Sequence, residues 1–192
     1  MKKILLFLLI LLVATSGYSQ RRSSKRRAKA YTEGSSSIHL GVGFAPTYYG
    51  GGYLNSSLPL AASYEYGFSD RISGGAFVGY SSFNTNYYLN EYYYKLTYLT
   101  IAARANYHFF FIRDNHWDPY AGATLGYNSV SFTYNPYNGY YGPAYTYTGT
   151  AGSGLLLGLQ AGTHYYFNKN VGAYAELGFG FSVFNLGVAF KF

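Results

Sequence analysis

The residue types that most often perform chemistry are few or poorly placed in this 192-residue sequence. Cysteine is absent, which excludes a disulfide, a zinc–thiolate site and a cysteine nucleophile. Serines are plentiful, but none has a histidine and a carboxylate placed to serve it, as a hydrolytic nucleophile would need. The histidines do not form a spaced set of metal ligands; they are His39, His108, His116 and His164. We therefore expect no catalytic residue, no metal site and no cofactor.

Charged residues are scarce, and their positions matter more than their sum. They make up 11% of the chain, against about 25% in an average soluble domain. The formal net charge of +7 suggests a nucleic-acid partner at first sight. From Ser36 to Phe192, however, six basic and six acidic residues cancel, so the excess lies within the first 35 residues. The neutral body of the chain gives no reason to expect a nucleic-acid partner.

The basic N-terminal part divides into two segments. Residues 1–19 have the charged start, the apolar run and the small residues of a secretory signal peptide, with cleavage expected between Ser19 and Gln20. The apolar run is far shorter than the roughly 20 residues of a membrane-spanning helix. Residues 20–35 have almost nothing apolar to bury, so we expect a basic, disordered periplasmic tail. This tail either contacts anionic lipid headgroups or cell-wall polymer, or is only a solvated leader.

The rest of the chain alternates apolar residues with small or polar ones, which is the two-residue period of a β-strand. In the first such stretch, Ile38 and Leu40 share one face and His39 lies on the other. The fifth stretch has an unclear register, because Leu125 and Tyr120 differ in parity, and a β-bulge would reconcile them. Eight stretches follow the pattern: residues 38–45, 58–68, 72–82, 96–109, 118–132, 153–167, 171–179 and 184–192.

The connections between these stretches alternate in length. Residues 46–57, 83–95 and 133–152 form long connections, whereas residues 69–71 and 168–170 form tight turns. Only the last connection, near residues 180–182, is short where a long one is due. Short periplasmic turns, longer outer loops and an even strand number are typical of bacterial outer-membrane barrels, whose closure leaves no backbone edge unpaired in lipid. We predict an all-β, eight-stranded antiparallel transmembrane β-barrel of the up-and-down type over residues 36–192.

A soluble barrel with its apolar residues inward is the alternative. Its outer surface would then consist of Gly, Ala, Ser and Thr with hardly a charge, which is a poor surface for water. In the membrane interpretation, aromatic residues fall at the strand ends next to the short turns and form a periplasmic girdle. They are Phe68, Tyr107, Phe109, Phe167, Phe190 and Phe192.

Three sequence segments carry a resemblance to a known family. They are Tyr-Gly-Phe-Ser-Asp-Arg (66–71), Pro-Tyr-Ala-Gly-Ala (119–123) and the closing Asn-Leu-Gly-Val-Ala-Phe-Lys-Phe (185–192). With the signal peptide, they make residues 36–192 resemble the small outer-membrane β-barrel family of the OmpA- and OmpX-like kind, often described as porin-like. The resemblance implies the outer membrane of a Gram-negative bacterium, contact with its lipid, and both termini in the periplasm. It also implies that barrel-insertion machinery reads a C-terminal signal carried by Phe184, Phe190 and Phe192.

Three charged residues share the inward parity of their strands and lie at similar heights above the short turns: Glu65, Arg104 and Glu176. Because a buried charge needs a partner, we predict that Arg104 pairs with Glu65, with Glu176 or with both. Such a polar network would fill and tie the lumen, since an eight-stranded barrel is about as wide as its own side chains. The other interpretation is a narrow path for ions or small solutes.

The long connections are rich in tyrosine, and Glu91 and Lys95 are their only charged residues. Tyrosine with Ser, Gly and Asn is also the composition of antibody binding loops, where a rigid ring gives contact area at low entropic cost. We hypothesise an extracellular surface that binds a glycan or a protein through Tyr92, Tyr93, Tyr94, Tyr137, Tyr140, Tyr141 and Tyr145. The alternative is that these tyrosines extend the strand pairing above the membrane and form its outer aromatic belt.

The function that these features favour is a structural or cell-surface interaction role without enzymatic activity. A small-solute channel is the second interpretation, and an outer-leaflet lipid-modifying enzyme is the third. The sequence itself names no ligand and no oligomeric state.

Overall fold

The computed structural model describes residues 30–47, 57–87, 92–110, 114–136, 147–150 and 152–192. Regular structure within these ranges consists of β-strands. None of the described residues forms a helix that is long and apolar enough to cross a membrane. The strands are β1 (Ser36–Pro46), β2 (Leu60–Gly67), β3 (Ile72–Tyr87), β4 (Tyr92–His108), β5 (Trp117–Pro136), β6 (Tyr147–Thr150), β7 (Gly154–Tyr166), β8 (Val171–Phe179) and β9 (Ser182–Lys191).

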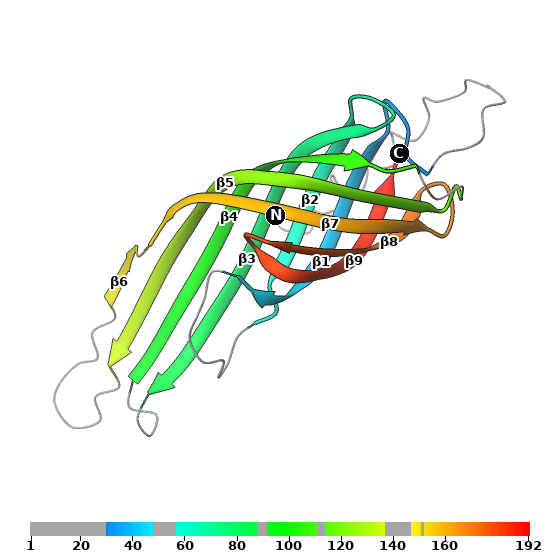
Figure 1. Cartoon of the computed structure of the whole chain (residues 1–192). Coiled ribbons are helices and arrows are strands. Elements are labelled where there is room, and N and C mark those ends of the chain that lie inside the picture. The colour runs from blue at the N-terminus through cyan, green and yellow to red at the C-terminus, as the bar shows by residue number, and fades with distance from the viewer. Residues whose placement is uncertain (1–29, 48–56, 88–91, 111–113, 137–146, 151) are drawn as a thin grey trace, which may run out of the picture.

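The strands close into a single antiparallel barrel (Figure 1). Along the sheet the order is β4-β3-β2-β1-β9-β8-β7-β5, and β4 also pairs with β5, which closes the ring. β6 and β7 pair one after the other with β5, so together they occupy one position in the wall. The wall therefore has eight positions, and the predicted all-β, eight-stranded, up-and-down barrel is confirmed.

The wall is apolar outside and polar inside, because successive side chains of a strand point to opposite faces. On β2, burial alternates from Leu60 to Gly67 without exception. Outward-facing Leu155 and Leu157 are 75% and 64% exposed, whereas inward-facing polar side chains such as Thr100 are fully buried. Among the described residues, buried polar side chains outnumber buried apolar ones. A soluble protein shows the opposite distribution.

The register of β5 is regular, so the bulge that would have reconciled its two parities is not needed. β5 pairs with β4 in an unbroken ladder, from Tyr92 opposite Pro136 to His108 opposite Tyr120. Tyr120 points into the lumen and is buried, whereas Leu125 points outward and is exposed. The sequence pattern was misleading because a large aromatic side chain fills the lumen here, so size alone does not mark the outer face.

β3 and β4 extend further than predicted, and Figure 1 shows them reaching, with β5, beyond the other strands at the end opposite the C-terminus. They pair up to Tyr87 and Tyr92, so their connection comprises residues 88–91 rather than 83–95. Tyrosine and threonine favour extended backbone even without apolar alternation, which is why the alternation underestimated the strands. Three tyrosines predicted to belong to a binding loop are therefore strand residues: Tyr92, Tyr93 and Tyr94.

The third long connection is shortened in the same way. Residues 133–136 continue β5, and β6 pairs with β5 between Ser131 and Tyr134. At the break between β6 and β7, the hydroxyl of Ser153 accepts a hydrogen bond from the backbone N–H of Val130 at 2.9 Å. Gly152 next to it has a φ of 66°, a left-handed conformation that glycine adopts without strain.

The last connection is a tight turn, as predicted, between Phe179 at the end of β8 and Ser182 at the start of β9. Gly180 has a φ of 110°, which a residue with a side chain rarely adopts. The turn sends Phe181 back into the lumen, where its ring meets that of Phe77 edge-on at 5.2 Å between centroids. A short turn at this position therefore helps to fill the barrel.

Candidate functional site in the barrel lumen

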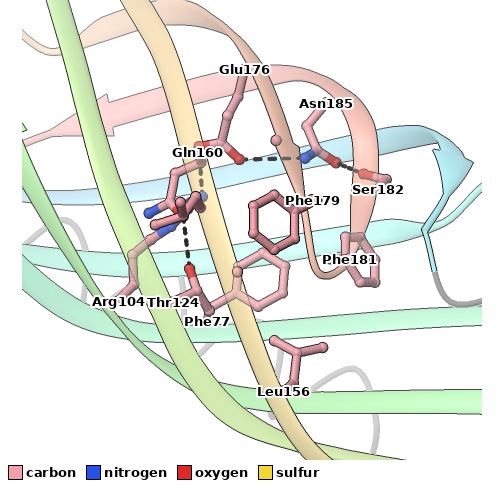
Figure 2. Close-up of a pocket in the computed structure, with 13 residues that line it drawn as sticks. Phe77, Arg104, Thr124, Leu156, Gln160, Glu176, Phe179, Phe181, Ser182 and Asn185 are labelled. Atoms are coloured by element: carbon pink, nitrogen blue, oxygen red, sulfur yellow. Dashed lines mark hydrogen bonds and ion pairs between the residues drawn. The ribbon is translucent and has the colours of Figure 1, made fainter.

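The shortest ion pair among the described residues joins Arg104 on β4 to Glu176 on β8 across the lumen. Nη2 of Arg104 donates to Oε2 of Glu176 at 2.6 Å, and both side chains are buried. The Tyr120 hydroxyl donates to the same oxygen at 2.8 Å, and the amide of Asn185 donates to Oε1 at 3.3 Å. Figure 2 shows Glu176 linked to Asn185 and, through it, to Ser182. Glu176 thus has a compensated charge and satisfied oxygens, as a buried carboxylate requires.

Glu65 on β2 belongs to the same cluster. Its Oε1 lies 4.0 Å from Nη1 of Arg104, so this ion pair is longer than the one with Glu176. Asn106 donates to Oε1 and the Ser73 hydroxyl donates to Oε2, both at 2.8 Å. The structure therefore brings together the three residues that the sequence singles out, and it places Arg104 in contact with both carboxylates.

A second series of contacts runs through three neighbouring strands close to the short turns. Nε2 of His108 on β4 lies 2.9 Å from the hydroxyl oxygen of Ser73 on β3. Nδ1 of His108 lies 2.8 Å from Oδ1 of Asp118 on β5. Serine, histidine and aspartate in this order at these distances resemble a hydrolytic triad. The expectation that no serine has a histidine and a carboxylate beside it is thus corrected.

This relay of Ser73, His108 and Asp118 is closed to substrate in the described structure. The exposed fractions of the three residues are 0%, 1% and 2%. The ring of Tyr31 also covers His108, with 3.7 Å between centroids and 4° between planes. The Ser73 hydroxyl also lies 2.8 Å from Oε2 of Glu65, so its single proton has a carboxylate acceptor besides His108. The arrangement ties β3, β4 and β5 together.

The other histidines are structural neighbours of this relay or lie in a turn. The rings of His39 and His164 stack at 4.6 Å between centroids, and Nδ1 of His164 lies 3.1 Å from Oδ2 of Asp118. His116 is partly exposed beside Asp114. The backbone N–H and the ring of His116 both contact Oδ1 of Asp114, and these hydrogen bonds lower the pKa of the Asp114 carboxyl. Within the described ranges, no group of three or more His, Cys, Asp or Glu residues is arranged to hold a metal ion.

The mouth of the lumen near the short turns is covered by a short N-terminal segment. We call residues 30–35 the strap, because they cross this mouth before β1 begins. The backbone N–H of Gly34 donates to the carbonyl of Gly67 at 2.9 Å. At the other end of the strap, Nζ of Lys191 donates to the carbonyl of Ala30 and lies 4.1 Å from the centre of the Tyr166 ring.

The strap corrects one part of the predicted N-terminal organisation. Residues 20–35 are expected to form a disordered tail, yet Ala30 and Tyr31 are buried in the barrel. Burial raises the pKa of the Tyr31 hydroxyl well above its usual value. The prediction averaged the composition of the whole segment and missed that its last residues include an aromatic ring able to stack in the mouth. Residues 20–29 lie outside the described residues.

Toward the opposite end of the lumen, apolar side chains pack beside buried polar ones such as Thr100. Phe77, Phe181, Ala61 and Ala102 form one buried cluster. Between this cluster and Arg104, Figure 2 shows the lining of a cavity of about 20 Å³. A volume of this size corresponds to about one water molecule. In the part of the chain that the structure describes, the lumen is therefore packed rather than open.

The remaining residues singled out from the sequence divide into two groups. Phe184 and Phe190 lie on β9, and the backbone of Phe192 exchanges two hydrogen bonds of 2.9 Å with Ser36 at the closing seam. Aromatic residues predicted for the girdle are exposed at the short-turn end, with Phe68 and Phe167 at 63% each. The expected cleavage site and part of the expected binding loop lie outside the described residues: Ser19, Gln20, Tyr137, Tyr140, Tyr141 and Tyr145.

Comparisons with known proteins agree on the fold. No protein-family model matches the chain, and no curated protein matches it. Among solved structures it is similar to Ail, the attachment invasion locus protein of Yersinia pestis in complex with the heparin analogue sucrose octasulfate. The TM-score is 0.55 at 16% identity, over 83% of this chain and 99% of Ail. It is also similar to the outer membrane protein OprG of Pseudomonas aeruginosa, with a TM-score of 0.51 at 13% identity over 84% of this chain and 97% of OprG.

Identities this low establish a shared architecture and nothing about shared ligands. This chain forms a closed antiparallel barrel with eight positions in its wall. The structural match extends over nearly the whole length of each neighbour. The chain therefore has the fold of the small outer-membrane β-barrels, as its resemblance to the OmpA- and OmpX-like family implies.

Proposed function

We propose that this chain is a β-barrel of the bacterial outer membrane with a structural or cell-surface interaction role. One observation supports the membrane placement above all others: the exposed face of the wall is apolar and the buried face is polar. Leu125, Leu157 and Leu177 are each more than half exposed on the outside of the barrel. Hydrocarbon solvates such a surface, and a closed barrel satisfies every backbone group that hydrocarbon cannot.

Two belts of aromatic side chains support the depth of this placement. Trp and Tyr collect at membrane–water interfaces because one end of the ring is apolar and the other is polar. Exposed aromatic residues surround the end with the short turns: Phe68, Tyr107, Phe109, Trp117, Tyr165 and Phe167. Others surround the wall near the opposite end of β1 and β8: Phe44, Tyr80, Tyr127 and Phe179. Short turns are typical of the periplasmic side, so we place both termini there.

The barrel is closed rather than conducting in this proposal. The Arg104 cluster and the Phe77–Phe181 cluster lie one after the other along the lumen, and the strap covers its mouth. Planar-bilayer recordings on the purified protein test this directly. We expect no steady conductance. A steady conductance that changes when Arg104 is replaced by methionine would instead establish the small-solute channel.

The interaction role rests on the composition of the outer connections. They are rich in tyrosine, and Glu91 and Lys95 are the only charged residues in the regions predicted as loops. Ail was solved with the heparin analogue sucrose octasulfate, a highly anionic ligand. Loops with so few positive charges favour an uncharged glycan or a protein surface over such a polyanion. Stacking against tyrosine rings would then supply the affinity.

Replacing four tyrosines tests the interaction role without changing the loop length. Tyr137, Tyr140, Tyr141 and Tyr145 are changed together to serine, and Asn138, Gly139, Gly142 and Pro143 are changed together to serine as the control. Adhesion of whole cells and binding to a glycan array are then measured. Loss with the tyrosine variant alone supports surface binding. Unchanged adhesion in both variants leaves only the structural role.

We also propose that the chain is not an enzyme. Support comes from the burial of the Ser73–His108–Asp118 relay and from the stacking of the Tyr31 ring over His108. An outer-leaflet lipid-modifying activity would need a nucleophile near the outer rim, whereas this relay lies close to the short turns. Mass spectrometry of lipid A after overexpression tests the proposal. An altered lipid A that returns to normal in the Ser73→Ala variant would overturn it.

Two further partners are proposed, the barrel-insertion machinery and an anionic lipid or polymer. β9 and the residue that follows it carry Phe184, Phe190 and Phe192, which we propose as the signal for barrel-insertion machinery. A Phe192→Ser variant should accumulate outside the outer membrane, and an unchanged membrane fraction would refute the signal. For residues 20–29, we propose contact with anionic headgroups or cell-wall polymer, because six of these ten residues are Lys or Arg.

A further inference from the structure

The wall of the barrel has a step between β7 and β8. β8 ends at Phe179, which pairs with Leu159, but β7 continues outward to Gly154. Residues 154–158 of β7 pair with residues 124–128 of β5 on one side only. On the other side, no strand pairs with these residues, and the backbone of Phe179 and Gly180 at the β8–β9 turn lies next to Leu157 and Gly158. The outer end of β7 therefore leaves a strand edge without a described neighbour strand.

A groove of about 400 Å³ occupies this step, and we call it the notch. Its outer bank is formed by Leu155, Leu157 and Phe179, whose side chains are exposed on the outside of the barrel. Asn128 lies at its inner end, and Thr47 with Gly180 forms the far bank. Small-molecule sites generally measure roughly 300–1,000 Å³, so the notch is large enough to hold part of a ligand.

The two ends of the notch differ in polarity. Among the large apolar residues that the structure describes, Leu155 and Leu157 have the largest exposed fractions, 75% and 64%. At the inner end, the Asn128 side-chain carbonyl accepts a hydrogen bond from the Thr100 hydroxyl at 3.0 Å. The notch thus offers an apolar bank facing outward and the polar amide of Asn128 facing inward.

We propose that the notch is a binding site for one membrane lipid. The acyl chain lies against Leu155, Leu157 and Phe179, and the polar head reaches over the edge of β7 toward the side-chain amide of Asn128. The inference rests on the proposed membrane placement, because the outer bank is continuous with the lipid-facing surface. The aromatic belt that includes Phe179 puts the notch at the level where acyl chains meet headgroups.

A lipid fits the notch better than an added peptide strand does. Strand addition gains its affinity from a row of main-chain hydrogen bonds along an open edge. Here the edge without a paired strand comprises only residues 154–158, and the backbone of Phe179 and Gly180 already lies against Leu157 and Gly158. An acyl chain needs no main-chain partner and gains by covering exposed apolar surface.

Photolabelling with a lipid probe tests the site in the full-length protein. The protein is reconstituted in bilayers of phosphatidylethanolamine and phosphatidylglycerol that contain a phosphatidylethanolamine with a diazirine at the end of one acyl chain. After illumination, labelled peptides are mapped by mass spectrometry. We expect labelling of residues 152–158 and 177–181 above the level of the other outward-facing strands. We also expect one lipid to remain bound in native mass spectrometry.

Filling the notch should remove this enrichment. Gly154 is a suitable position, because a Cβ added there meets no atom within 4 Å and its φ is not in the left-handed region. Gly154→Trp should bring labelling down to the background of the other strands and release the retained lipid. Ala161→Trp, outward on the same strand and away from the notch, is the control and should change neither. Leu157→Ser serves as a second variant, which weakens the bank without adding volume.

The outcomes separate this inference from the proposed function. Labelling spread over all outward faces in proportion to their exposure, and unchanged in Gly154→Trp, overturns the lipid site but leaves the membrane placement intact. Labelling absent from every outward face overturns both. Displacement of the label by an extended peptide, with no effect of competing phospholipid, would assign the notch to a strand-like partner and overturn the lipid proposal.

Discussion

Arg104 contacts two carboxylates at different distances, and this difference determines which contact matters for stability. Nη2 of Arg104 lies 2.6 Å from Oε2 of Glu176, a carboxylate that also accepts hydrogen bonds from Tyr120 and Asn185. Nη1 of Arg104 lies 4.0 Å from Oε1 of Glu65, a carboxylate that accepts hydrogen bonds from Ser73 and Asn106. Removing one partner of a buried pair leaves the other charge uncompensated, which is costlier than replacing both.

The Glu176→Gln variant should therefore be strongly destabilised, by about 3–5 kcal/mol, because Arg104 stays charged inside the barrel. A double-mutant cycle with Arg104→Met should give a larger coupling energy for Glu176 than for Glu65. Unfolding in lipid vesicles with guanidinium chloride measures both cycles. Equal coupling of Arg104 to the two glutamates would contradict the assignment.

Ser73 links Glu65 to His108, so its hydroxyl should contribute to stability rather than to catalysis. The Ser73→Ala variant removes one hydrogen-bonding contact each from buried Glu65 and His108. It should lower the free energy of unfolding by about 1–3 kcal/mol. Ser131→Ala on the exposed side of β5 is the matched control and should be neutral. The wild-type protein should not react with a fluorophosphonate probe, because Ser73 is buried. Labelling of Ser73 by that probe would show an accessible nucleophile.

Alternation along the strands was enough to predict that Glu65, Arg104 and Glu176 meet. Counting residues from the short turns gives the face of the wall on which a side chain lies and its height in the barrel. The same count contained a signal for the relay. Ser73, His108 and Asp118 all have inward parity and lie at or next to the ends of their strands. The signal was missed because serines were too numerous to be tested one by one, and because strand neighbours need not be close in sequence.

At the scale of elements, the strap is the part that the sequence pattern did not reveal. It has no periodicity and follows a long basic segment. Its place in the barrel becomes clear only from the structure, through the stacking of Tyr31 on His108 and the hydrogen bonds to Gly67 and Lys191. Strand ends were also misjudged where tyrosine replaces apolar alternation, as in β3 and β4. Strand number, order and the short turns could be predicted, since they depend on the two-residue period and on turn residues.

Tyr31 should control whether the strap stays in the mouth. The peptide bond between Lys29 and Ala30 is a trypsin site whose second residue is buried in the wild-type protein. Tyr31→Ala removes the stacking and should make this bond cleavable under mild digestion, whereas Tyr31→Phe keeps the ring and should preserve protection. Mass spectrometry of the digest identifies the new N-terminus. Equal cleavage in both variants and the wild type would show that the strap does not depend on the ring.

The β8–β9 turn should depend on one glycine. Gly180→Ala introduces a Cβ at a φ of 110° and only 2.8 Å from the Cα of Gly158. Such strained positions cost about 1–3 kcal/mol. Gly154→Ala provides the control, because its added Cβ meets nothing within 4 Å. Thermal unfolding followed by circular dichroism should separate the two variants, and an identical transition temperature would argue against the turn geometry.

At the scale of the whole molecule, the distribution of polarity accounts for the unusual composition. In the proposed placement, charges are few because the outer face of the wall meets lipid. Glu65, Arg104, Asp118 and Glu176 are buried in the lumen, whereas other charged residues, such as Arg71, Asp114 and Lys169, are exposed near the short turns. Tyrosines are many because they occupy both the strand extensions and the outer connections, and lipid does not require that. The membrane placement does not explain why the outer end has so few charged residues and so many tyrosines, and this composition supports the proposed interaction role.

Cysteine labelling on intact cells tests the central claim, the membrane placement with its orientation, most directly. The chain contains no native cysteine, so each substitution gives a single label site. A membrane-impermeant maleimide should react with Gly139→Cys on intact cells, with Lys169→Cys only after the outer membrane is permeabilised, and with Leu125→Cys in neither case. Rapid reaction of Leu125→Cys, or reaction of Lys169→Cys on intact cells in place of Gly139→Cys, would contradict the account.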